Sequence, residues 1–123
     1  MTVNTKYISL IILVFLLSFH FNNCARIFQT YEGRIVGEVR LSDNPPTGNG
    51  GVDIYTDAML TSSRDDGKFS LEGSIVRNGM IDLYLEKSGY NTKLLEIHFD
   101  NFEFDENERI NICDVGEVVL AKI

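Results

Sequence analysis

Two adjacent carboxylates, a glycine and a lysine stand together in the stretch "TSSRDDGKFSLEG", and such a group could bind a cation or a phosphate. An EF-hand calcium loop needs oxygen ligands at alternate positions and a closing glutamate, and a phosphate loop needs Gly-Lys-Ser/Thr. Phe69 instead follows Gly67 and Lys68, and the calcium spacing is absent. The Asp66-Gly67 step lies between extended segments and predicts a hairpin turn, because glycine tolerates positive φ. A weak metal site is the alternative, and we expect no metal.

His98 is the one histidine after position 20, and it lies between Ile97 and Phe99. Alternation along a strand would put it on the solvent side, opposite those two apolar neighbours. The sequence places no general base near Ser62 or Ser63. We therefore expect no catalytic residue and no cofactor, and we predict that the protein is not an enzyme.

Tyr55 and Tyr84 are expected to point outward from their strands. Exposed tyrosines on a sheet can stack on a sugar or anchor a protein partner, because the ring is large and rigid and carries a polar tip. They can equally be ordinary surface residues. The absence of tryptophan weakens the saccharide case.

The segment "DNFEFDENER" groups Asp100, Glu103, Asp105, Glu106 and Glu108. These carboxylates could bind a divalent cation or a basic partner. A solvated loop, whose charges discourage edge pairing, is the simpler interpretation.

The amino terminus carries Lys6, then an apolar run from Leu10 to Leu17, and then the polar residues His20, Asn22 and Asn23. This order is typical of a secretory signal peptide, and the run is shorter than the roughly 20 residues of a membrane span. We expect residues 1–23 to be the signal peptide. "FNNC" resembles a bacterial lipobox, which would make Cys24 the lipidated first residue of the mature protein, followed by a short tether, 24–32.

Cys24 and Cys113 are the only cysteines. In an exported chain they could form a disulfide. If Cys24 is lipidated or removed, Cys113 is a small buried apolar residue. No Cys/His spacing typical of a zinc site is present.

The net charge is −7, from 18 acidic and 11 basic residues. Binding to nucleic-acid phosphates needs clustered Lys and Arg, and none occur. We expect no nucleic-acid partner.

From Gly33 onward, apolar and polar residues alternate with the period of half-buried strands. Short strands separated by turn residues predict an antiparallel sandwich. We expect residues 33–123 to form one all-β domain, a seven-stranded antiparallel Greek-key β-sandwich. Its inward residues would include Phe69, Leu71, Leu83, Leu85, Ile97, Ile110 and Ile112. The last strand leaves two choices of inward face, Val118 with Leu120 or Val119 with Ile123.

Several motifs follow one another in a set order: Gly37-x-Val39, Pro46 and Gly51, Asp66-Gly67-x-Phe69-x-Leu71, Gly89-Tyr90, and Val115-Gly116 with Leu120. Together they resemble the carboxypeptidase regulatory-like domain of the transthyretin-like (prealbumin-like) sandwich superfamily. The resemblance covers nearly everything after the leader and implies an accessory fold that flanks enzymes, transporters or surface proteins.

We accordingly expect an exported, non-catalytic cell-envelope lipoprotein that is anchored to a membrane through Cys24, at the outer membrane or cell surface. It would act in protein interaction or adhesion, with another envelope or membrane protein as its partner. The alternative is a secreted or periplasmic module that binds carbohydrate or peptide, with Tyr55 and Tyr84 as the binding residues.

Overall fold

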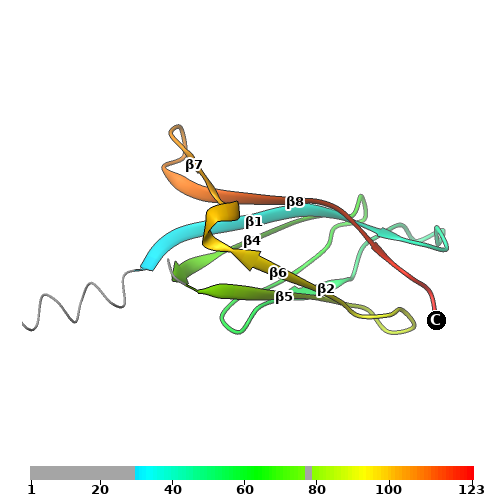
Figure 1. Cartoon of the computed structure of the whole chain (residues 1–123). Helices are drawn as coiled ribbons and strands as arrows, with labels where there is room; N and C mark the ends of the chain where they lie inside the picture. The colour runs from blue at the N-terminus through cyan, green and yellow to red at the C-terminus, as the bar shows by residue number, and fades with distance from the viewer. Residues whose placement is uncertain (1–29, 77–78) are drawn as a thin grey trace, which may run out of the picture.

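The structure, a computed structural model, describes residues 30–76 and 79–123. These residues form two four-stranded sheets that pack face to face (Figure 1). The first sheet has the order β4-β1-β8-β7, and the second sheet has the order β3-β2-β5-β6. The strands are β1 (Thr30–Leu41), β2 (Asp53–Tyr55), β3 (Leu60–Ser62), β4 (Lys68–Val76), β5 (Met80–Glu86), β6 (Lys93–His98), β7 (Glu103–Asp105) and β8 (Ile110–Leu120), with one 3₁₀ turn, η1 (Phe99–Asn101), between β6 and β7.

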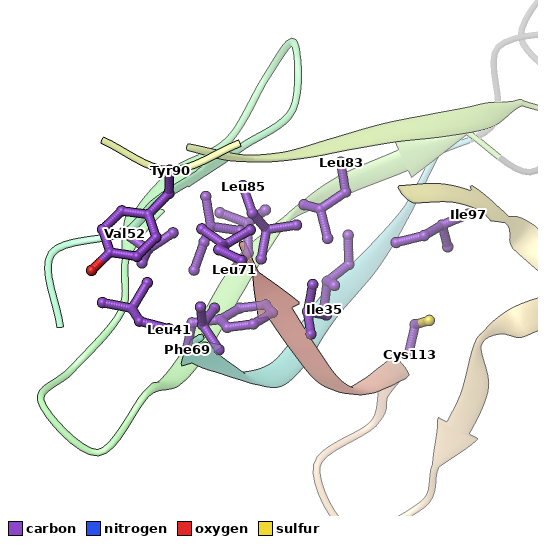
Figure 2. Close-up of a cluster of buried hydrophobic side chains, with 14 of the residues drawn as sticks. Ile35, Leu41, Val52, Phe69, Leu71, Leu83, Leu85, Tyr90, Ile97 and Cys113 are labelled. Carbon is purple, nitrogen blue, oxygen red and sulfur yellow. The ribbon is translucent and has the colours of Figure 1, made fainter. Parts of the chain in front are cut away.

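The core lies between the two sheets, where the alternating apolar side chains meet (Figure 2). Five of the seven residues expected to point inward are buried: Phe69, Leu71, Leu83, Leu85 and Ile97. Tyr90 stands at one end of this cluster and Cys113 at the other. Period-two alternation therefore predicted the packed faces of β4, β5 and β6 correctly.

Two features of the expected architecture are wrong. There are eight strands among the described residues rather than seven, and β1 runs parallel to β8. A parallel pair needs a long crossover connection, and residues 42–109, which pass through the second sheet, supply it. β1 therefore lies between an antiparallel neighbour, β4, and a parallel neighbour, β8.

The turn at Asp65-Asp66-Gly67 is confirmed, but it does not close a hairpin. β3 belongs to the second sheet and β4 to the first, so the turn carries the chain from one layer to the other. Gly67 has φ +86°, its N–H donates to the Arg64 carbonyl at 2.7 Å, and the Asp66 side chain accepts from the Lys68 N–H at 3.0 Å. The residues of the turn were enough to predict the turn itself. They could not predict which strands pair, because pairing depends on segments far away in the sequence.

A β-bulge changes which side chains of β8 face the core. Val36 pairs with Asp114 and Glu38 with Glu117, so β8 has one residue more than β1 over this interval. Gly116 takes φ +71° at the bulge. Before it, Cys113 pairs with Ile35 and is buried; after it, Val118 and Leu120 are buried.

The inward assignment of Ile110 and Ile112 is therefore wrong. Ile112 pairs with Arg34 on the outer face of the first sheet. The next residue, Cys113, points inward instead. Of the two choices for the end of β8, the structure selects Val118 with Leu120.

The expected signal peptide 1–23 and Cys24 lie outside the described residues. β1 begins at Thr30, so residues 30–32 of the expected tether belong to the sheet. Within the ranges described, no helix has the length and apolarity of a membrane span.

Candidate functional site

The outer face of the second sheet carries an apolar row that crosses all four strands. Strand register pairs Leu60 with Tyr55, Tyr55 with Tyr84, and Tyr84 with Leu94. Leu60 is 73% exposed and Leu94 is 46% exposed, while the two tyrosines between them are half-buried. We call these four residues the aromatic row.

The two tyrosines of the aromatic row stack on each other. Their ring centroids lie 5.2 Å apart and their planes are inclined by 16°, which is an offset-stacked pair. The Tyr55 hydroxyl donates to Glu86 Oε2 at 3.0 Å, and this hydrogen bond raises the pKa of Tyr55. The rings are thus held in place on the free protein, so a partner that docks on them loses little additional side-chain entropy.

Carboxylates flank the aromatic row on both sides. Asp53 of β2 stands directly opposite Glu86 of β5, and Asp82 of β5 stands directly opposite Glu96 of β6. All four are exposed, and the ion pairs found in the described ranges, which join Arg34, Arg40 and Arg64 to other acids, leave them out. We call these two cross-strand pairs the acidic borders.

Like charges placed directly opposite each other on neighbouring strands destabilise a sheet. The acidic borders therefore oppose folding, and they do so on both sides of one exposed apolar row. Glu86 accepts a hydrogen bond from Tyr55, but the ion pairs of the described residues offset neither pair of carboxylates. Residues that break a rule of local stability in this way point to a binding surface. The arrangement suits a ligand that supplies apolar area in the middle and positive charge at the edges.

The binding residues expected from the sequence make up only part of this face. Tyr55 and Tyr84 point outward as expected, and the sheet brings them together. Sequence reasoning missed Leu60, Leu94 and the acidic borders, because their alignment depends on strand register. The signal in the sequence that could have indicated them was an outward apolar residue on each of two strands, Leu60 in β3 and Leu94 in β6.

The other chemistry-bearing side chains lie elsewhere. His98 is exposed at the end of β6, opposite Met80. Ser63 is buried, and its hydroxyl accepts from the Val52 N–H at 3.0 Å and donates to the Asn49 carbonyl at 2.8 Å. Ser63 therefore anchors the glycine-rich loop before β2.

The acidic segment after β6 is more ordered than a solvated loop, so that expectation is corrected. Residues 103–105 form β7, and the Asp105 side chain accepts from the Asn107 N–H at 2.9 Å in the following turn. Glu108 forms an ion pair with Arg34, which also binds Glu72 at 2.6 Å. Within 30–76 and 79–123, no three His, Cys, Asp or Glu side chains gather as metal ligands would.

Cys113 is 4% exposed and packs in the core beneath the first sheet. Burial, with a smaller contribution from Asp114, raises the pKa of its thiol. Its position agrees with the expectation of a small buried apolar side chain.

An open hollow of about 660 Å³ lies away from the aromatic row. It is lined by Arg64 and Lys68 at the inter-sheet turn and by Glu38, Asp114 and Glu117 near the bulge. The aromatic row by contrast is an extended strip, which suits a macromolecular surface better than an enclosed small molecule.

No known protein-family model matches the chain, and no curated protein sequence matches it. A solved structure, the 3-chlorocatechol 1,2-dioxygenase from Rhodococcus opacus 1CP, is similar with a TM-score of 0.52 and 13% sequence identity. The match covers 78% of this chain, which spans 62% of the length of that protein. At this identity the likeness shows a shared fold.

The prediction that the protein is not an enzyme is contradicted by this neighbour. A similar strand arrangement occurs in a protein that is named as a dioxygenase, so the sandwich gives no ground for excluding catalysis. The chain is thus similar in fold to part of an enzyme.

Proposed function

We propose that the protein is an exported cell-envelope module that binds a protein partner through the outer face of its second sheet. The observation that carries this proposal is the aromatic row between two acidic borders that the ion pairs of the described residues leave out. Leu60, Tyr55, Tyr84 and Leu94 offer contiguous apolar area, and aromatic side chains are typical anchors of protein interfaces. The borders select a partner with Lys or Arg around its apolar contact.

The stacked tyrosines favour a protein over a saccharide. In the pair each ring gives one face to the other, and the Tyr55 hydroxyl is already bonded to Glu86. Stacking takes one of the two faces of each ring and so reduces the area on which a sugar could stack, whereas a protein side chain can also pack on ring edges and on the neighbouring leucines.

Lipidation of Cys24 is part of the proposal and rests on the apolar run before that residue. Because β1 begins at Thr30, six residue steps join Cys24 to the sandwich. At no more than about 3.6 Å per residue, the domain would stand at most about 22 Å from a membrane. That distance suits a partner in the same membrane.

We also propose that the domain belongs to the carboxypeptidase regulatory-like group of the transthyretin-like superfamily, and the two-sheet fold supports this.

The test is photo-cross-linking in intact envelope membranes. A photoreactive amino acid replaces either Leu94, in the aromatic row, or Val119, which is exposed on the outer face of the first sheet. We expect a defined protein adduct from position 94 that is lost in a Tyr55→Ala/Tyr84→Ala variant, and no such adduct from position 119. Equal yields from both faces would refute the proposal. Tyrosine resonances that move on addition of simple sugars, without any protein adduct, would support the saccharide alternative.

A further inference from the structure

Among residues 30–76 and 79–123, the aromatic row ends at a sheet edge. There β6 is the outermost strand of the second sheet, and its pairing partner is β5. It is six residues long, whereas β3 at the opposite edge has three. Proteins protect sheet edges by shortening the strand, covering it or placing charge on it. β3 is protected by its length, while β6 carries the charges of Lys93 and Glu96 but presents a longer row of backbone donors and acceptors.

We propose, building on the function above, that the partner contributes an extended segment that pairs with the edge of β6 in antiparallel orientation and becomes an additional strand of the second sheet. Side chains directly opposite each other on neighbouring antiparallel strands have Cβ atoms about 4.5–5.5 Å apart. A residue opposite Leu94 would therefore prolong the aromatic row, and the neighbour opposite Glu96 would extend a line that already contains Asp82.

The side chains on β6 specify the sequence pattern of this strand. Leu94 and Glu96 are two residues apart and share the outer face. Their partners on an added strand are also two residues apart, and in antiparallel pairing the residue opposite Glu96 comes first. An aromatic residue suits Leu94 beside the stacked tyrosines. A Lys or Arg suits Glu96, because it would neutralise the border formed by Asp82 and Glu96.

The pattern is thus a basic residue, any residue, then an aromatic residue. The main-chain hydrogen bonds would give affinity, and the alternate side chains would give specificity. A second copy of this chain fits the edge less well, because its net charge is −7 and two such chains repel each other.

The experiment uses the full exported chain, purified in detergent, and short fluorescent peptides. The first peptide carries Lys-Thr-Tyr in an otherwise threonine-rich extended sequence. The second has the same composition with the order Tyr-Thr-Lys. The third keeps the first sequence but has N-methyl groups on alternate backbone nitrogens, which removes the donors that would pair with β6. Fluorescence anisotropy measures the affinity of each.

We expect the first peptide to bind, and the reversed and N-methylated peptides to bind at least about tenfold more weakly, which corresponds to about 1.4 kcal/mol. Glu96→Lys should abolish binding, whereas Glu117→Lys on the other sheet, the matched control, should leave it unchanged. Hydrogen exchange should show protection of β6 amides by the first peptide only.

Each other outcome overturns the strand pairing. Equal binding of the N-methylated peptide would show docking on the face alone, in which case the proposed function stands and the added strand fails. If none of the peptides binds, the proposed partner segment is refuted. It is also refuted if β6 amides become protected without peptide as the protein concentration rises, because a second copy of the chain would then occupy the edge. The cross-linking experiment decides the proposed function independently, because it does not depend on backbone pairing.

Discussion

Gly67 lies where the inter-sheet turn contacts the backbone of β1. It has φ +86°, a conformation that side chains disfavour. A Cβ built there would stand 2.2 Å from the carbonyl oxygen of Val39, and that contact is with backbone rather than with a flexible side chain. The same segment is tied to β1 by the Val39 N–H, which donates to the Gly67 carbonyl at 2.8 Å.

Gly116 provides a matched control. It has φ +71°, and an added Cβ would meet nothing within 4 Å. Gly116→Ala should therefore lower the free energy of unfolding by the conformational term alone, about 1–2 kcal/mol. Gly67→Ala carries the same term, must also move the backbone, and weakens a hydrogen bond worth about 0.5–1.5 kcal/mol. We expect a total loss of about 3–5 kcal/mol for Gly67→Ala.

Urea unfolding of both variants, followed by circular dichroism, measures the difference. A domain of this size has a total stability of about 5–15 kcal/mol, so the Gly67→Ala midpoint should fall steeply, or the variant should fail to fold. Equal losses in the two variants would refute the reasoning, because the close approach to Val39 would then contribute nothing.

Three further predictions concern the core, the thiol and the anchor. Phe69 is 5% exposed, so Phe69→Ala should lower the free energy of unfolding by about 3–5 kcal/mol in the same assay; a loss below about 1 kcal/mol would contradict its core position. Burial raises the pKa of the Cys113 thiol above its ordinary 9.0, so folding favours the protonated thiol. The stability gained is complete below that ordinary value and is lost as the pH rises through the folded pKa. The native chain should therefore lose more stability than Cys113→Ala as the pH rises above 9.0, and parallel pH profiles would argue against this reasoning. Cys24→Ser should release the protein from membranes in detergent partitioning, and unchanged attachment would remove the lipoprotein proposal.

The sequence alone predicted the side-chain directions along individual strands. Phe69 and Leu71 in β4, and Leu83 and Leu85 in β5, are buried as their alternation required. Alternation is a property of a single extended segment, so it can be read without knowing the neighbouring strand. The turn before Lys68 was predictable for the same reason, because Asp66 and Gly67 act on their own backbone.

Only the tertiary structure decided which strands are neighbours, and in which register. It aligned Leu60 and Leu94 with the two tyrosines, and it put β8 parallel to β1. It also gave β8 an extra residue at Gly116, which turned Cys113 inward in place of Ile112. Pairing joins segments far apart in the chain, and a shift of one residue reverses every side chain of a strand. The sequence therefore specified the faces of regular strands such as β4 and β5, while packing of the whole chain set the faces of the bulged β8 and assembled the strands into a surface.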